Sequence, residues 1–335
     1  MASISGLVNI IITTYGGSEK LERAINTAIN QTYQNIQVIV VDDNNPDTEA
    51  RERTEKIVEK FHNIIYIKHE KNKNASAARN TGIDASKGEY LAFLDDDDVF
   101  LPTRIEKLVK FIETKDIDVE GIASSVAFVN SDGINSVLSY PTGTEVSQRG
   151  MLTGESWLGT GSNIFVRRDA ALSISGFDDS YNRFQDVEFT IRFLKENRII
   201  WLDDILVIKE ESDVRKPNYA KTKVAYKKLH NDFSYIIESM DEKQRYQFEK
   251  NHLMNLFWIA YQDSDDDHNK LYSLMCQKNM LKFKDIILIN IKKSAFRIVP
   301  QFAIDIIQQK KNDVRILETK QMLGSTYEDL MMFLR

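Results

Sequence analysis

The 335-residue chain has a single cysteine, no excess of basic residues and no long hydrophobic run. Cys276 alone excludes an internal disulfide and a cysteine-rich zinc site, as in proteins of a reducing cytoplasm. The 44 basic residues against 50 acidic ones give a net charge of -6, whereas a nucleic-acid-binding protein normally has a basic excess. The apolar stretch Leu7–Ile12 is too short for a signal peptide or a membrane span. We therefore expect a cytoplasmic, soluble or peripheral protein that binds no nucleic acid.

Two common nucleotide-binding motifs are also missing. The Gly16-Gly17 turn lacks the G-x-G-x-x-G spacing of dinucleotide-binding proteins, and no G-x-x-x-x-G-K-[ST] phosphate loop occurs. A sugar nucleotidyltransferase would need a glycine-rich triphosphate loop, so its absence argues against that class of enzyme.

The chain does contain four consecutive aspartates, Asp95–Asp98, directly after the apolar run Tyr90–Leu94. That run predicts a buried strand, which places the aspartates at its carboxyl end, where open α/β sheets bind ligands. Adjacent carboxylates repel one another, so keeping them ionised beside an apolar sheet favours a bound cation. Oxygen ligands favour Mg²⁺ or Mn²⁺. The alternative is a solvated turn that caps the next helix.

Short β-branched runs alternate with helical stretches over the first hundred residues. The expected strands are Val8–Tyr15, Val38–Val41, Ile64–Ile67 and Tyr90–Leu94. This alternation predicts an α/β fold with a mostly parallel central sheet flanked by helices. Two of the strands end in polar residues, Thr13-Thr14-Tyr15 and Asp42-Asp43, which suit hydrogen bonds to a base and a ribose. Capping of the following turn is an equal alternative for the two aspartates.

The segment Asn72–Gly82 combines small residues with Arg79 at the start of a predicted helix. Small side chains let a ligand approach closely, and an arginine at a helix terminus suits a diphosphate. A tightly packed helix with a surface arginine is the alternative.

Further along, Ser139–Ser156 is rich in polar residues and glycine and predicts a mobile loop over the site. Trp157 follows among glycines, where it can stack on a sugar ring or pack in the core. Beyond Pro217 all patterns are helical, so we expect a catalytic domain at 1–215, with its nucleotide-binding half at 1–100 and its acceptor half at 101–215. A helical region follows at 216–335.

In this last region apolar residues lie next to basic ones over Ile286–Lys293 and Phe296–Lys311. The pattern suits an anionic membrane surface at the inner face of the cell membrane. A helical lid or a homodimer contact through the helical region remains open.

Several segments in order resemble the signatures of the family 2 inverting glycosyltransferases, bacterial enzymes with the GT-A nucleotide-sugar fold. The resemblance covers residues from about 7 to 210, and its segments are Val8–Tyr15, Asn30–Tyr33, Val40–Asn44, Ala78–Gly82 and Phe93–Asp98 with Pro102. Gly176–Asp179 and Phe184–Phe189 extend it.

The resemblance implies roles for individual residues. Thr13 and Asp43 would hold the uracil, Tyr15 and Arg79 would border the uridine and the phosphates, and Asp95-Asp96-Asp97 would form the acidic metal signature. Asp97 would coordinate the metal, Asp95 would lie nearer the ribose, and Asp96 and Asp98 would support them or face solvent. The extra acid at Asp96, where the family often has a small residue, leaves the assignment among the four open.

The same resemblance maps the catalytic base to Asp186, with Glu188 as the second candidate. A base is required because a sugar hydroxyl is too weakly acidic to attack at neutral pH. The chain departs from the family at Gln185, where an acid commonly precedes the base, and at Lys209-Glu210-Glu211, where a histidine often stands.

These features predict a metal-dependent inverting glycosyltransferase. It would move a sugar from a UDP-sugar donor to a lipid-linked or protein-linked saccharide acceptor in bacterial polysaccharide biosynthesis, with acceptor contacts at Trp157. The alternatives are a catalytically silent nucleotide-sugar binding module, which would account for Gln185 and the missing histidine, and a sugar nucleotidyltransferase.

Overall fold

The computed structural model describes residues 3–115, 119–130, 133–210 and 218–281, together with Ile286 and Ile289. The chain divides into two compact units. The first comprises Met1–Ala127, Leu138–Glu210 and Ala225–Met240, and the second comprises Phe128–Val137, Glu211–Val224 and Asp241–Arg335. The domain limits 1–215 and 216–335 stay a prediction.

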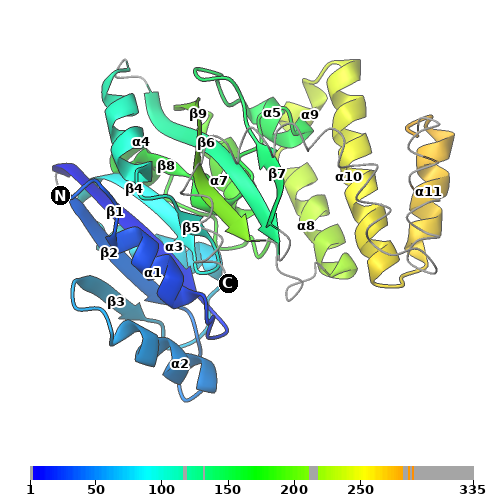
Figure 1. Cartoon of the computed structure of the whole chain (residues 1–335). Helices are drawn as coiled ribbons and strands as arrows, with labels where there is room; N and C mark the ends of the chain where they lie inside the picture. The colour runs from blue at the N-terminus through cyan, green and yellow to red at the C-terminus, as the bar shows by residue number, and fades with distance from the viewer. Residues whose placement is uncertain are drawn as a thin grey trace. The chain divides into compact units, whose positions relative to one another are not determined.

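The expected alternation of strands and helices is present over the first hundred residues. The elements there are β1 (Ile4–Thr14), α1 (Leu21–Ile29), β2 (Ile36–Asp42), α2 (Glu49–Val58), β3 (Ile64–Lys68), α3 (Ala75–Ala85) and β4 (Gly88–Asp95). The four strands are parallel in the order β3-β2-β1-β4, drawn from blue to cyan in Figure 1.

The sheet continues with antiparallel strands beyond β4. The next elements are β5 (Val99–Phe100), α4 (Arg104–Glu113), β6 (Val119–Asn130), β7 (Gly133–Leu138), α5 (Gln148–Thr153), the 3-10 turn Gly161–Asn163, β8 (Phe165–Arg167), α6 (Arg168–Ser173), α7 (Gln185–Phe193) and β9 (Arg198–Glu210). The full order is β3-β2-β1-β4-β8-β6-β9-β5, with β7 paired to β6. The mixed α/β fold with a central sheet is confirmed. Its parallel part is limited to β3-β2-β1-β4, whereas the pairs β4–β8, β8–β6 and β9–β5 are antiparallel.

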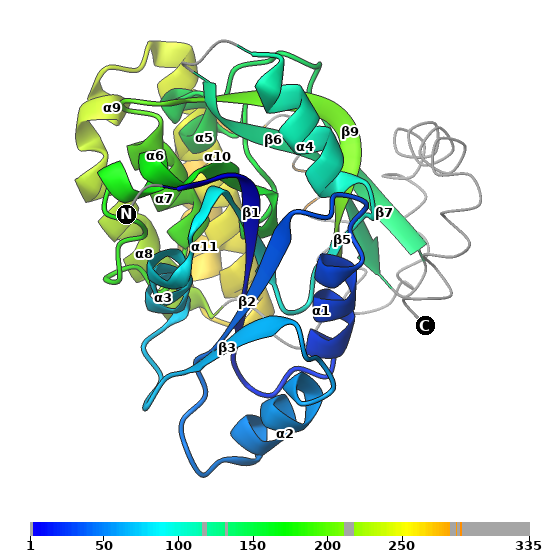
Figure 2. The same cartoon turned by 90° about the vertical axis from the view of Figure 1, so that its left-hand side faces the viewer.

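Side-chain alternation in the parallel strands explains why helices cover both faces. Ile39 and Val41 pack against Ala78 of α3, and α3 can approach because residue 82 is glycine: a Cβ there would lie 2.4 Å from the Ile11 side chain. Successive residues of a strand face opposite sides, so the fully buried Ile10 and Val40 point to the other face. Figure 2 shows α1 and α3 on opposite sides of β1 and β2.

The segment Ser139–Ser156, predicted to be a loop, contains one short helix. Residues 148–153 form α5, and the Ser147 side chain caps it by accepting a hydrogen bond from the Gly150 N–H. Val146 and Leu152 are buried. Most of the remaining residues of the segment are loop or turn, and its mobility over the site stays a prediction.

The described part of residues 216–335 is helical, as expected. It contains α8 (Tyr219–Asp232), α9 (Ser234–Glu238), α10 (Glu242–Gln262) and α11 (Asp267–Gln277). None of the described helices combines the length and apolar character needed to cross a membrane. The predicted surface or dimer segments from Ile286 to Lys311 lie outside the described residues, apart from Ile286 and Ile289.

Candidate active site

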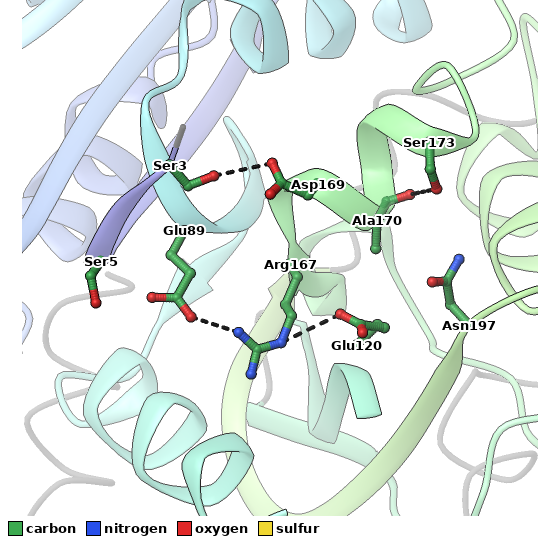
Figure 3. Close-up of a pocket in the computed structure, with 9 residues that line it drawn as sticks. All are labelled: Ser3, Ser5, Glu89, Glu120, Arg167, Asp169, Ala170, Ser173 and Asn197. Atoms are coloured by element: carbon green, nitrogen blue, oxygen red, sulfur yellow. Dashed lines mark hydrogen bonds and ion pairs between the residues drawn. The ribbon is translucent and has the colours of Figure 1, made fainter. Parts of the chain in front are cut away.

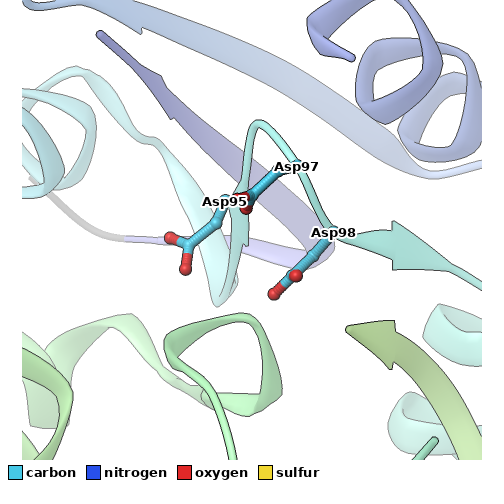
Figure 4. A group of neighbouring side chains, drawn as sticks. All are labelled: Asp95, Asp97 and Asp98. Carbon is cyan, nitrogen blue, oxygen red and sulfur yellow. The ribbon is translucent and has the colours of Figure 1, made fainter. Parts of the chain in front are cut away.

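The acidic run forms a tight turn at the carboxyl end of β4. The Asp98 N–H donates to the Asp95 carbonyl at 3.1 Å, and carboxylate oxygens of Asp95, Asp97 and Asp98 lie within 4.8 Å of one another (Figure 4). Asp96 lies outside this group, because its carboxylate is buried and accepts a hydrogen bond from the Thr14 hydroxyl at 2.6 Å. The turn therefore divides four adjacent acids into a group of three and one that faces the sheet.

Asp98 is fully buried and bound by the protein itself. Its Oδ2 accepts hydrogen bonds from the hydroxyls of Thr160 at 2.8 Å and Ser162 at 2.6 Å. Its Oδ1 lies 3.4 Å from the Lys209 ammonium. Burial raises the pKa of Asp98 to about 6, although the charge of Lys209 opposes the rise. Asp98 thus holds the turn together rather than facing an open space.

The donor set fits a hard divalent cation. Three neighbouring carboxylates supply oxygen ligands of the kind that Mg²⁺ and Mn²⁺ prefer. In the described part of the chain Asp95 pairs with Arg79 and Asp98 pairs with Lys209, whereas Asp97 forms no ion pair. Asp97 is therefore the carboxylate of this group that no ion pair occupies, and its role as the metal ligand stays a prediction.

Arg79 enters the site from the first turns of α3. Its Nη2 donates to Asp95 Oδ1 at 2.6 Å, and its guanidinium lies 5.3 Å from the centre of the Phe177 ring. The side chain is buried, and within the described residues its Nη1 has no hydrogen-bond partner. Because an unpaired buried N–H is costly, Nη1 is a candidate donor to a ligand oxygen.

Asp186 lies in the first turn of α7, close to Arg79. A Cβ on Gly161 would lie 3.2 Å from Arg79 Nη2 and 3.7 Å from the Asp186 Cβ. Arg79 and Asp186 therefore both lie next to Gly161, and a larger residue there would crowd Arg79. Burial raises the pKa of Asp186, while the Arg79 and Lys209 charges lower it and the Asp95 charge adds to the rise. The predicted base and the acidic turn therefore share one site.

The backbone that presents Asp186 is unusual. Phe184, the residue that caps α7, has φ of 62° and ψ of 28°, a left-handed conformation that bulky residues rarely adopt. Its ring packs against that of Tyr226, with 4.6 Å between the ring centres. The left-handed turn lies directly before α7, which begins at Gln185, one residue before Asp186.

The other acids considered from the sequence are engaged in ion pairs. Glu188 is buried and paired with Arg192, one helical turn further along. Glu210 pairs with Lys20 at 2.7 Å and Arg23 at 2.6 Å, which lower the pKa of its carboxyl despite burial. Glu211 lies outside the described residues.

Asp43 is buried at the end of β2 and organises the following loop. Its carboxylate lies 2.7 Å from His69 Nδ1 and accepts hydrogen bonds from the Asn72 side chain at 2.8 Å and from the backbone N–H groups of Lys73 at 2.8 Å and Asn74 at 2.9 Å. Its predicted contact with the uracil stays a prediction. A base placed here would meet a carboxylate that already accepts four hydrogen bonds.

The remaining predicted residues lie on the same sheet edge or on the surface. Thr13 pairs in register with Asp95 across β1 and β4, which places the two side by side. Tyr15 follows directly and is 51% exposed. Trp157 is 38% exposed, so it is not a core residue, and its backbone N–H donates to the Tyr140 hydroxyl at 3.2 Å. The roles of these residues stay predictions.

Three side chains of the site carried little or no weight in the sequence analysis. Thr160 and Ser162, which bind Asp98, belong to a small polar turn before a short strand, a signal too common to single out. Lys209 stands in a Lys-Glu run that resembles ordinary surface sequence. Only the fold shows that β9 places Lys209 beside the acidic turn.

A separate cavity of about 590 Å³ lies at the opposite end of β4 (Figure 3). Arg167 occupies its centre, donating to Glu89 at 2.6 Å and lying 3.4 Å from Glu120. Glu89 stands near the start of β4 and Asp95 at its end, so this cavity is remote from the acidic turn.

The chain matches known glycosyltransferases. The family model described as glycosyl transferase family 2 matches residues 9–174. An uncharacterized glycosyltransferase of Methanocaldococcus jannaschii is 37% identical over 129 residues, covering 38% of this chain and 44% of that protein. The Escherichia coli protein WfaP is named a UDP-Glc:alpha-D-GlcNAc-diphosphoundecaprenol beta-1,3-glucosyltransferase. It is 34% identical over 139 residues, covering 37% of this chain and 53% of that protein. The chain thus spans about half the length of these relatives.

Solved structures show the same fold. A crystal structure of Staphylococcus aureus TarS 1-349 in complex with UDP-GlcNAc aligns with a TM-score of 0.53 at 16% identity, covering 76% of this chain and 81% of that one. The complex of the same protein with UDP aligns with a TM-score of 0.50 at 19% identity, covering 75% and 80%.

Proposed function

Because this chain is a family 2 glycosyltransferase with the GT-A fold, we propose that it is a metal-dependent, inverting enzyme. It transfers a sugar from a UDP-sugar to a saccharide acceptor. The observation that carries the proposal is the convergence of Asp186, Arg79 and the acidic turn on one site. A base, a donor for phosphate oxygens and a set of metal ligands are the three parts that such a transfer needs.

In the proposed reaction, Asp186 accepts the proton of an acceptor hydroxyl. The hydroxyl oxygen forms a bond to the anomeric carbon from the face opposite the diphosphate, the bond from that carbon to the diphosphate oxygen breaks, and UDP leaves. The configuration at the carbon is inverted, so a UDP-α-sugar yields a β-linkage. The raised pKa of Asp186 suits a group that must take up a proton during the reaction.

The nucleotide is held by residues on the carboxyl edge of the sheet. Thr13 and Asp43 contact the uracil, Tyr15 borders the uridine, and Asp95 lies nearer the ribose with Asp96 supporting it. Arg79 donates to the phosphates through its unpartnered Nη1. Asp97 would hold Mg²⁺ or Mn²⁺, which when bound supplies positive charge that stabilises the leaving diphosphate.

The acceptor is a growing glycan on a lipid carrier or a protein, and the product belongs to a bacterial surface polysaccharide. Support comes from WfaP, whose name gives a diphosphoundecaprenol-linked acceptor. Trp157, with its exposed ring, contacts the acceptor sugar. The enzyme works at the inner face of the cell membrane, and residues 216–335 supply peripheral or dimer contacts.

The test is the release of UDP from a panel of UDP-sugars, with and without Mn²⁺, by the wild type and by Asp186→Asn. The expected result is Mn²⁺-dependent release from one donor, which falls by about 10²- to 10⁴-fold in the variant while UDP binding is kept. Intact UDP binding without turnover of any donor in the wild type would instead support a silent binding module.

A further inference from the structure

The side chain of Lys209 places a positive charge next to the acidic turn. It stands at the end of β9, and its Nζ lies 3.4 Å from Asp98 Oδ1 and 3.5 Å from the Thr160 hydroxyl. A lysine amine beside a carboxylate is an ammonium at neutral pH. Lys209 therefore places a positive charge next to the group that is expected to bind a metal.

Charge pairing in the site leaves little net attraction for a second cation. Of the three clustered carboxylates, Asp95 is paired with Arg79 and Asp98 with Lys209. One carboxylate, Asp97, remains to attract a divalent ion, while the Lys209 ammonium repels it. A nucleoside diphosphate adds phosphate charges and oxygen ligands, so it reverses this balance.

We propose that Lys209 is a resident cation that keeps the free enzyme from binding divalent ions tightly, so that the ion is taken up together with the nucleotide diphosphate. This inference rests on the proposed function, because it requires a diphosphate ligand at the acidic turn. Lys209 is a positioning residue here: it acts on the affinity of the site through its charge and through Asp98.

The experiment measures Mn²⁺ binding by the loss of the free-ion electron paramagnetic resonance signal, with the full-length protein and without any turnover. The wild type is expected to bind Mn²⁺ weakly alone and at least about tenfold more tightly with saturating UDP. Lys209→Met removes one charge near the ion and is expected to tighten Mn²⁺ binding to the free protein by about tenfold. Lys209→Arg keeps the charge and the wild-type affinity.

A matched control is Lys107→Met. Lys107 also pairs with an aspartate, Asp204, at 2.6 Å, but it is more exposed and lies on α4. This variant is expected to bind Mn²⁺ as the wild type does, which separates a local effect from a general change in net charge.

In Lys209→Met the buried Asp98 carboxylate loses its counter-charge, which could unfold the protein. A second variant therefore removes both charges. Asp98→Asn combined with Lys209→Met removes both charges of the pair, and its Mn²⁺ affinity should return close to that of the wild type. A purely structural role of Lys209 would change the melting temperature and leave the Mn²⁺ affinity of the free protein unchanged.

The outcomes separate this inference from the proposed function. Equal Mn²⁺ affinities of free wild type and Lys209→Met, or equally tight binding by the wild type with and without UDP, would overturn the inference while UDP binding stands. If the wild type binds no UDP under any condition, the proposed nucleotide-sugar function fails as well.

Discussion

Ion pairing between neighbouring side chains decides which of the four aspartates is left for chemistry. Asp96 is hydrogen-bonded to Thr14, Asp98 is enclosed by hydroxyls and Lys209, and Asp95 is paired with Arg79. In the described chain, Asp97 has no ion pair of the kind that Asp95 and Asp98 form. Identical residues in a row therefore have different roles, because each one points to a different neighbour.

The first prediction compares two of these aspartates. Asp97→Asn is expected to abolish the effect of Mn²⁺ on UDP binding, because it removes the unpaired carboxylate. Asp96→Asn should keep that effect and lower stability by about 1 kcal/mol, since the amide weakens the hydrogen bond from the Thr14 hydroxyl. Calorimetric titration of UDP with and without Mn²⁺, together with urea unfolding, measures both. Equal loss of the Mn²⁺ effect in the two variants would contradict this division of roles.

The second prediction concerns pH. As the proposed base, Asp186 would act only when deprotonated, and burial raises its pKa above the ordinary aspartate value. The rate constant kcat/KM should therefore be full above this raised pKa and fall about tenfold per pH unit below it. The acid limb should lie at a higher pH than that of an exposed aspartate. UDP binding measured over the same range is the control, and a limb that follows UDP binding would assign it to another group.

At the scale of elements, the placement of α7 depends on the pair Glu188 and Arg192. Arg192 binds Glu188 and also donates to the carbonyl oxygens of Ile174 at 2.6 Å and Gly176 at 2.7 Å. The helix that carries Asp186 is thereby tied to the preceding turn. A buried pair of this kind fixes orientation, although its net contribution to stability is small.

The third prediction follows from that geometry. Arg192→Met leaves the buried Glu188 carboxylate and two carbonyl oxygens without their donor, so the free energy of unfolding should fall by about 2 to 4 kcal/mol. Adding Glu188→Gln should recover part of this loss, because the uncompensated charge is gone. Chemical denaturation of both variants measures the difference. No recovery in the double variant would show that the carbonyl contacts carry the effect.

At the scale of the whole molecule, every residue of the candidate site belongs to the first compact unit. The second unit has its own apolar cluster of Phe257, Met275, Met280 and Ile289. Ligand binding stabilises the part of a protein that it contacts, so the two units should respond differently to the nucleotide.

The fourth prediction is that UDP with Mn²⁺ slows hydrogen exchange in the loops after β1, β2 and β4 and in the first turn of α7, and leaves α10 and α11 unchanged. Hydrogen-exchange mass spectrometry measures this directly. When EDTA removes the Mn²⁺, the turn Asp95–Asp98 should lose more of its protection than the loops after β1 and β2. Equal protection of α10 and α11 would show that the helical region takes part in nucleotide binding.

Local patterns in the chain determined the α/β fold and the edge of the sheet at which the site lies. Runs such as Val38–Val41 alternate with helical stretches, and an apolar run followed at once by aspartates can end only at the sheet edge. The composition of Ser139–Ser156 gave no sign of the short helix α5, in which Met151 and Leu152 are buried.

The sequence by itself determined which residue types meet at that edge, because parallel strands bring their carboxyl ends together whatever their loops do. Only the tertiary structure decided how those residues pair. Lys209 reaches Asp98 from 111 residues away, and Arg79, Gly161 and Asp186 meet through three separate segments. Charges act through space over a few ångströms, so the partner that occupies a carboxylate depends on the folded arrangement and cannot be read from its neighbours in the chain.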